Sequence, residues 1–319
     1  MPRILPPRSG NQYTIQSGEY QAVIAQQGAS LRSLTYQGKN VIVPFDADDM
    51  GTTSQGRVLV PFPNRLADGE YTFHGTRHLL PIDEHDRRTA IHGFGHQHLW
   101  TLASVEDDRV RLTWRVPCMT GYPFDLVVDA VYEVSASGLA LTISAWNHGN
   151  ADAPWAVGLH PWIANGHDGY GDEIDADNGR CRITVPARMH VTVNDRLLPT
   201  GTESVEGTAY DLRQPTTLTG RHFDDAWTDL IKDGSGDATA TLTRPDGMTV
   251  SIQGDSTVTS FQVCTGTGFP AQTRPAGIAI EPQTAYADAF NSGIDLMVVH
   301  PDDTVSTTLS LSASMANGR

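Results

Sequence analysis

The sequence predicts an all-β fold, a large antiparallel β-sandwich, on three observations. Apolar and polar residues alternate with a period of two in many short segments, as they do in strands with one buried face. Helical periodicity hardly occurs. Segments rich in Gly, Asn, Asp and Ser separate the alternating stretches and favour the tight turns between short strands. Because no linker or repeat interrupts this pattern, we expect a single domain over residues 1–319, with a division near residue 165 as the alternative.

The clearest strand is expected at residues 138–146, where Leu139, Leu141 and Ile143 alternate with small or polar residues. The same alternation predicts strands over residues 109–116, 126–134, 182–185, 238–243, 248–252 and 256–263. Pro245-Asp246-Gly247 is a turn sequence between two of them, which predicts a hairpin over residues 241–252. The Gly- and Asp-rich residues 165–179 lack the ligand spacing of a calcium loop, and we expect a solvated surface loop there.

The net charge of the chain restricts the kinds of molecule that it is expected to bind. The 22 Lys and Arg residues against 37 Asp and Glu give a net charge of −15, which argues against a nucleic-acid backbone or an anionic membrane as partner. No run of about 18 apolar residues predicts a membrane span, and the first ten residues lack the apolar core of a signal peptide. Cys118, Cys181 and Cys264 are odd in number and widely spaced, so we expect buried reduced thiols and a cytoplasmic protein.

The candidate catalytic and binding residues lie in four segments, at residues 56–75, 91–100, 158–164 and 278–291. Glu281 follows the apolar Ile278 and Ile280, so we expect a buried carboxyl whose pKa is raised toward the range of a general base. A glutamate paired with an arginine is the alternative. His160 precedes a proline, which favours an extended or turn backbone and predicts an imidazole presented from a strand end.

The other histidines are weaker candidates. His92, His96 and His98 are spaced two and four residues apart and would share one face of a strand, but no nearby cysteine completes a zinc site, so we expect no metal. The chain also lacks the G-x-S-x-G sequence of serine hydrolases and the glycine-rich loops that bind nucleotides.

Five motifs together resemble the aldose 1-epimerase (galactose mutarotase) family. They are PFPNRLADGEYTF at 61–73, HGFG at 92–95, GLHPW at 158–162, FDDAW at 223–227 and IEPQTAYADAFN at 280–291, and they occur in the family's order. The resemblance implies that family's large antiparallel sandwich, the supersandwich. This sequence departs from the family's usual pattern at Trp162-Ile163, where many members have Tyr-Phe, and at Trp227, where phenylalanine is common.

The resemblance also implies roles for individual residues. Glu281 matches the family's catalytic base and His160 its general acid. His92 matches a second active-site histidine, Arg65 a contact to a sugar hydroxyl, and Asp224 a carboxylate that holds hydroxyls. Asp225 is the alternative to Asp224, and only one of the two enters the site because neighbouring strand residues point to opposite faces. Asn64 and Gln283 are expected to support the site, and Trp162 or Trp227 to stack on the sugar or to lie in the core.

Interconversion of the anomers of a free aldohexose such as glucose or galactose needs one base at the C1 hydroxyl and one acid at the ring oxygen, so no cofactor is expected. The expected partner is a monosaccharide, and the chain is expected to be a monomer or a homodimer. Three alternatives stay open. They are a glycoside hydrolase that uses Glu281 and Asp224 as its carboxylate pair, a non-catalytic carbohydrate-binding sandwich, and a hexose-6-phosphate mutarotase with Arg57 or Arg88 at the phosphate.

Overall fold

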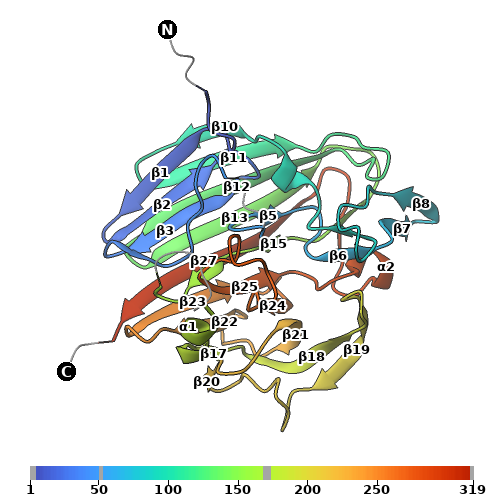
Figure 1. Ribbon diagram of the computed structural model, residues 1–319. Coiled ribbons are helices and arrows are strands. Elements are labelled where there is room, and N and C mark those ends of the chain that lie inside the picture. Colours follow the sequence, from blue (N-terminus) through green and yellow to red (C-terminus); the bar gives the residue numbers. More distant parts are fainter. Residues whose placement is uncertain (1–4, 50–52, 168–173, 317–319) are drawn as a thin grey trace.

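The computed structural model describes residues 5–49, 53–167 and 174–316, and strands dominate these residues (Figure 1). The expected all-β class is confirmed: two large antiparallel sheets and a four-stranded one contain most of the strand residues of the described chain. No helix in the described residues is long and apolar enough to cross a membrane.

The larger sheet has nine strands in the order β10-β11-β12-β13-β27-β23-β22-β17-β20. Their bounds are Thr101–Val105, Arg109–Arg115, Leu126–Ser135, Gly138–Asn147, Thr304–Met315, Met248–Gly254, Ala238–Thr243, Arg182–Thr184 and Thr216–Thr217. In β12 and β13 every second residue is buried, as the alternation predicts. The expected hairpin over residues 241–252 is confirmed by the pairing of β22 with β23.

The second large sheet carries the candidate chemistry. Its strands are β19 (Pro199–Ser204), β18 (Ala187–Val193), β21 (Asp224–Leu230), β24 (Ser260–Cys264), β25 (Gly277–Gln283), β15 (Gly158–Leu159) and β5 (Val58–Leu59), with β16 (Trp162–Ala164) also paired to β25. Strands from both sides of residue 165 therefore hydrogen-bond within both large sheets.

The remaining elements are short. A four-stranded sheet joins β1 (Gln12–Ser17), β2 (Tyr20–Ala25), β3 (Leu31–Tyr36) and β4 (Lys39–Asn40) and lies across β11–β13 (Figure 1). The two-stranded pairs are β6 (Arg65–Ala67) with β9 (Thr89–Ile91), β7 (Glu70–Phe73) with β8 (Thr76–Leu79), and β14 (Ala153–Trp155) with β26 (Met297–Val299). The helical elements are η1 (Gly95–Gln97), α1 (Ile174–Arg180) and α2 (Ala289–Ser292).

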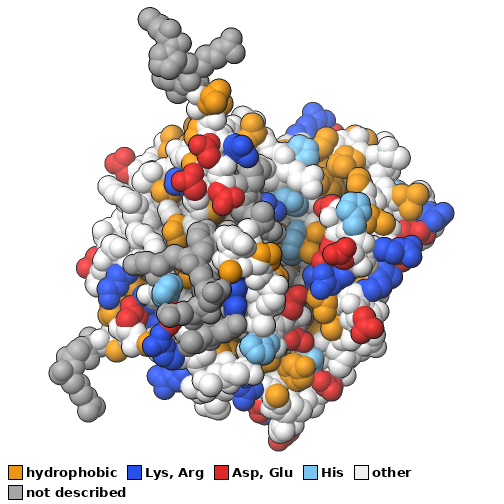
Figure 2. Space-filling view, in the orientation of Figure 1, with side chains coloured by type: hydrophobic (Ala, Val, Ile, Leu, Met, Phe, Trp, Pro, Cys, Tyr) orange, Lys and Arg blue, Asp and Glu red, His pale blue; other side chains and the backbone are white. Residues whose placement is uncertain are grey.

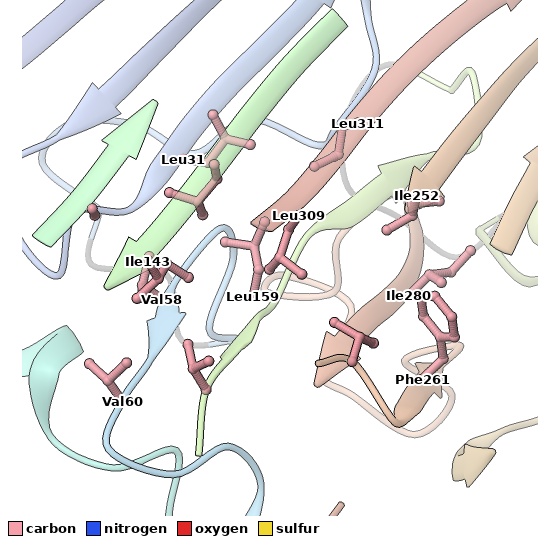
Figure 3. Close-up of a cluster of buried hydrophobic side chains, with 14 of the residues drawn as sticks. Leu31, Val58, Val60, Ile143, Leu159, Ile252, Phe261, Ile280, Leu309 and Leu311 are labelled. Carbon is pink, nitrogen blue, oxygen red and sulfur yellow. The ribbon is translucent and has the colours of Figure 1, made fainter. Parts of the chain in front are cut away.

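The core lies between the sheets. Figure 3 shows Ile143, Leu309 and Leu311 of the nine-stranded sheet gathered with Leu159, Phe261 and Ile280 of the other large sheet. Burying such side chains contributes roughly 1.5–3 kcal/mol each relative to leaving them exposed. Because the core takes up one face of β24 and β25, their other face is available for polar chemistry.

Three local expectations are corrected by the structure. Residues 174–180 form α1, and Asn165 and Asn178 are buried and bonded to each other, so the segment 165–179 is not a solvated loop throughout; its residues 168–173 lie outside the described part. Cys118 is exposed, whereas Cys181 and Cys264 are buried and free as expected. The strand expected at 256–263 begins at Ser260, because Val258 donates its N–H to the Asp255 carbonyl in a turn.

Candidate active site

A polar cavity of about 400 Å³ opens beside β21, β24 and β25. Figure 2 shows histidine side chains inside a hollow near the centre of the molecule, with charged side chains of both signs around it. Of the residues to which the resemblance assigns a role, those that line this cavity are Asn64, Arg65, His92, His160, Trp162, Asp224 and Glu281, whereas Gln283 does not. Its polar lining consists of Thr53, Ser54, Arg57, Asn64, Arg65, Asp83, Glu84, Arg87, His92, His96, His160, Asp224, Gln262 and Glu281.

The strand register brings three of these groups onto one face. Glu281 of β25 pairs with Gln262 of β24, and Gln262 pairs with Ala226 of β21, two residues beyond Asp224. Residues two apart in a strand share a face, so Asp224, Gln262 and Glu281 all point away from the core. Gln262 donates to the Asp224 carboxylate over 2.9 Å. Glu281 lies within β25 and is buried as expected.

His160 lies between β15 and β16, in agreement with its expected place at a strand end. Its backbone N–H donates to the Arg57 carbonyl, and its own carbonyl accepts from Gly56. The neighbouring Trp162 stacks near the imidazole, with ring centroids 5.9 Å apart, and donates its Nε1–H to the Thr53 carbonyl. The backbone of His160 is thus fixed by hydrogen bonds, and its imidazole packs against an anchored indole.

His160 and Glu281 form a buried pair, with Nε2 of the histidine 3.3 Å from Oε1 of the glutamate. Burial, helped by the nearby Asp224 carboxylate, raises the pKa of Glu281 well above its ordinary value, against the opposing effect of Gln283 and Arg65. Burial lowers the pKa of His160 to about 3. The alternative of a glutamate paired with an arginine is therefore replaced by a glutamate paired with a histidine.

His92 is held by a reciprocal pair of bonds with Asn64. The His92 N–H donates to the Asn64 carbonyl, and the Asn64 N–H donates to Nδ1 of His92 over 3.2 Å. Because a backbone N–H can only donate, Nδ1 accepts and the neutral ring carries its proton on Nε2. Burial and the neighbouring His160 lower the pKa of His92 well below its usual value. His92 therefore offers a neutral N–H donor to the cavity.

The backbone around His92 is tightly built, and this gives a first prediction. Gly93 has a φ of +63°, and a Cβ there would lie 2.2 Å from the Val60 carbonyl oxygen. We expect Gly93→Ala to lower the free energy of unfolding by about 2 kcal/mol or more, since the left-handed backbone and the clash both oppose a side chain. Gly75→Ala is the matched control, because φ is +78° but a Cβ there would meet no atom within 4 Å. Equal losses of stability in urea unfolding of both variants would contradict the prediction.

Arg65 begins β6 at the cavity wall, where Glu84 binds it through two bonds. Its Nε donates to Oε2 of Glu84 over 2.8 Å and its Nη2 to Oε1 over 3.0 Å. Nη2 also lies 3.9 Å from Oδ2 of Asp224. Burial opposes the charge of Arg65, but Glu84 and Asp224 outweigh it and raise the pKa of the guanidinium. Arg65 therefore stays a cation that faces a carboxylate on each side.

Of the two adjacent aspartates, Asp224 lines the cavity while Asp225 lies on the opposite face of β21. Asp225 contacts Nε2 of the buried His190 at 3.0 Å, and Nδ1 of His190 lies 3.1 Å from Glu203. Its second carboxylate oxygen accepts the backbone N–H of Asp224. The expectation that only one of the pair enters the cavity is thus consistent with the strand geometry.

The glutamine, the two tryptophans and the two arginines that were expected at or near the site differ in whether they line the cavity. Gln283 lies behind the cavity wall and donates its amide to Glu281 over 3.0 Å. Trp162 lines the cavity with 1% of its surface exposed, which suits a wall better than an open stacking platform. Trp227 lies in the core and donates to the Tyr210 carbonyl, so it does not stack on a ligand. Arg57 lines the cavity, whereas Arg88 lies outside it and pairs with Asp68.

Sequence reasoning missed Glu84, Gln262 and Phe269, which also line the cavity. Gln262 had a usable signal, because it is polar between the apolar Phe261 and Val263 of a strand. Glu84 had no such signal, since it lies in a charged stretch that resembles a solvated loop.

His96 belongs to the 3₁₀ helix η1 and not to a strand, so the prediction that the three histidines share one strand face is wrong. Within the described residues, no three His, Cys, Asp or Glu side chains gather as a metal site would require.

Comparisons with known proteins show the family of the chain. The sequence model of the aldose 1-epimerase family matches residues 11–312. An uncharacterized protein of Escherichia coli, YihR, is 31% identical over 91% of this chain and 89% of its own. The galactose mutarotase of Rattus norvegicus is 30% identical over 53% of this chain and 47% of its own length.

Solved structures share the fold at lower identity. A GalM/aldose epimerase homologue from C. elegans superposes with a TM-score of 0.83 at 19% identity, covering 96% of this chain and 99% of that one. The galactose 1-epimerase of Lactobacillus acidophilus superposes with a TM-score of 0.77 at 18% identity, covering 94% of this chain and 92% of that one.

Proposed function

The chain belongs to the aldose 1-epimerase family, and from that premise we propose that it interconverts the α and β anomers of a free aldohexose such as glucose or galactose. The observation that carries this proposal is the buried pair of His160 and Glu281, 3.3 Å apart, at the wall of a cavity lined with hydroxyl-binding groups. One acid and one base in contact with the same ligand are what mutarotation requires.

The reaction needs two proton transfers at the anomeric centre. Glu281, as the carboxylate, takes the proton of the C1 hydroxyl, and the C1–O5 bond breaks as His160 gives its proton to O5. The products are an open-chain aldehyde, a protonated Glu281 and a neutral His160. After rotation about C1–C2, His160 takes the proton back from the O5 hydroxyl as O5 attacks the other face of C1, and Glu281 reprotonates O1. The pair ends in its starting state.

The pKa shifts of Glu281 and His160 indicate which protonation state of the pair burial favours. With one proton shared, the pair is either the carboxylate and imidazolium that open the ring, or the neutral acid and neutral imidazole that close it. A raised pKa of Glu281 and a lowered pKa of His160 both favour the neutral form. Residue type alone suggests an ordinary histidine pKa, and burial makes that expectation wrong. Transfer across the 3.3 Å contact interconverts the two forms.

The other side chains would hold the sugar in place. Arg65 and Asp224 supply a cationic donor and an anionic acceptor, which make strong hydrogen bonds to hydroxyls. His92 supplies a neutral N–H, and Asn64 donates to Gln262 over 3.2 Å while its Oδ1 accepts from the backbone of Arg65. Orientation of this kind lowers the barrier by holding C1 and O5 at the reacting pair.

The direct test follows the optical rotation of freshly dissolved α-D-glucose and α-D-galactose with and without the protein. The proposal expects the approach to equilibrium to accelerate in proportion to protein concentration. Saturable sugar binding without acceleration would support the carbohydrate-binding alternative and overturn the proposal. Release of sugar from a glycoside without faster mutarotation would point to the hydrolase.

A hexose 6-phosphate is the second candidate substrate, because Arg57 lines the cavity. The same measurement with α-D-glucose 6-phosphate decides between the two substrates. A kcat/KM for the phosphate that exceeds the value for glucose, and that falls selectively in Arg57→Met, would favour the phosphorylated sugar. The free aldohexose is favoured if Arg57→Met changes both substrates alike.

A further inference from the structure

We infer that Glu84 is a positioning residue for sugar recognition, which holds the guanidinium of Arg65 so that Arg65 and Asp224 together bind one sugar hydroxyl. The inference rests on the proposed function and adds a residue that neither the sequence motifs nor the reaction itself requires. Three features of the cavity wall support it.

The first feature is the way Glu84 binds Arg65. Both carboxylate oxygens accept from one edge of the guanidinium, from Nε over 2.8 Å and from Nη2 over 3.0 Å. Paired bonds of this kind fix the plane of an arginine as well as its position. The edge that carries Nε is thereby occupied, so the donors left for a ligand are those of Nη1 and the second hydrogen of Nη2. Nη1 lies 3.4 Å from Oδ1 of Asn64.

The second feature is that Glu84 is itself held from several directions. Thr89 donates its hydroxyl to Oε2 over 2.6 Å, and Arg87 donates to Oε1 over 3.0 Å. The backbones of Glu84 and Thr89 exchange two hydrogen bonds, and Thr89 belongs to β9, which pairs with the strand of Arg65. A carboxylate fixed in this way transmits its position to the guanidinium, whereas an exposed ion pair does not.

The third feature is the gap between Arg65 and Asp224. Nη2 of Arg65 and Oδ2 of Asp224 are 3.9 Å apart, which is too long for a hydrogen bond. A hydroxyl both accepts and donates, so a sugar hydroxyl beside this gap accepts from Arg65 and donates to Asp224. A hydrogen or an ether at the same position of the sugar loses one or both bonds. The pair therefore selects for a hydroxyl, and its selectivity depends on Glu84 keeping Arg65 in place.

The test is a double-mutant cycle on kcat and KM for α-D-glucose, with the wild type, Glu84→Gln, Arg65→Met and the double variant. We expect Glu84→Gln to raise KM by about tenfold with kcat changed by less than about threefold, since the bonds to the sugar form before the chemistry. In the Arg65→Met background, we expect the same replacement to change KM by less than about twofold, because two residues that act through one contact are not additive.

The sugar itself gives a second readout. The wild type is assayed with the 2-deoxy, 3-deoxy, 4-deoxy and 6-deoxy derivatives of glucose. At least one derivative is expected to show a raised KM in the wild type, and for the derivative that lacks the hydroxyl bound by Arg65 and Asp224 the replacement Glu84→Gln is expected to add no further increase. Glu84→Asp restores the charge but shortens the side chain, and it is expected to fall between the wild type and Glu84→Gln.

Glu70→Gln is the matched control. Glu70 also binds an arginine through both oxygens, Arg77 on the neighbouring strand β8, but the pair is exposed and outside the cavity. The inference expects Glu70→Gln to leave KM unchanged. Equal and additive effects of Glu84→Gln with and without Arg65, or a fall in kcat that follows the thermal stability of the variants, would overturn it. If the wild type accelerates no aldose, it is the proposed function that fails.

Discussion

Replacing Glu281 by glutamine is expected to lower kcat for mutarotation by about 10²- to 10⁴-fold, the usual contribution of a positioned proton-transfer group. The amide keeps the shape of the side chain and its place opposite Gln262 in the sheet. It cannot take the proton of the C1 hydroxyl, because an amide is not basic near neutral pH. Polarimetry at several sugar concentrations separates this fall in kcat from a change in KM.

The thermal stability of Glu281→Gln provides the control for this prediction. The pKa of Glu281 is raised in the folded protein, so the folded state binds its proton more tightly than the unfolded state does. Stability therefore decreases as the pH rises from the unfolded pKa toward the folded one. The amide of Glu281→Gln does not titrate and avoids this loss, so above the ordinary pKa of a glutamate the variant is expected to have a Tm equal to or above that of the wild type.

This combination distinguishes a catalytic role from a structural one. A buried carboxylate that served the fold would lower the Tm when replaced, and activity would decrease only with the folded fraction. If Glu281→Gln retained near-normal kcat, or lost activity only together with stability, Glu281 would not be the base.

Much of the fold could be predicted because one face of most strands is buried. Alternation in residues such as Leu139, Leu141 and Ile143 needs no information from distant parts of the chain, since it records only which face meets the core. The order of the strands could not be predicted in this way. The pairing of β13 with β27 joins residues more than 150 positions apart, and it depends on packing of the whole sandwich.

The candidate site also has residues that could be predicted from the sequence and one that could not. His160, Glu281, His92, Arg65 and Asp224 lie in recognisable motifs, and the structure gathers them in one cavity. Glu84 lies in the run DEHDRR, which has the composition of a solvated loop. Its role depends on a contact with Arg65, 19 positions away, and on the strand pair β6–β9 that brings the two together.

The electrostatics of the site were the least accessible from sequence. The pKa of a histidine depends on how completely the fold removes water from it, and residue type alone suggests only the ordinary value. Burial at the end of β15 lowers the pKa of His160 to about 3. Since the two side chains are also 3.3 Å apart, the proposed reaction expects His160 and Glu281 to act as a coupled pair that shares one proton, and not as two independent groups.

His160→Gln is the sharpest test of that coupling. We expect kcat to fall by about 10²- to 10⁴-fold, as for the partner, because the ring oxygen loses its proton donor. A glycoside hydrolase built on Glu281 and Asp224 would depend on both carboxylates, and loss of His160 alone would not abolish its activity. His96→Gln is the matched comparison, since burial also lowers the pKa of His96 to about 3 and it lines the same cavity outside the His160–Glu281 pair. We expect that variant to keep most of its kcat.

The pH profile then gives a result that no structural role reproduces. In the wild type, kcat/KM is expected to fall as the pH rises through the raised pKa of Glu281, because the pair loses the one proton it must share. On the acid side, activity is expected to persist until the pH approaches the His160 pKa of about 3, unless the protein unfolds first. In His160→Gln the residual reaction needs only the Glu281 carboxylate, with water as the acid, so its rate is expected to rise over the same alkaline range. Profiles with the same slope in both proteins would show that the proton is not shared, and the pair would then have to be assigned as two separate groups.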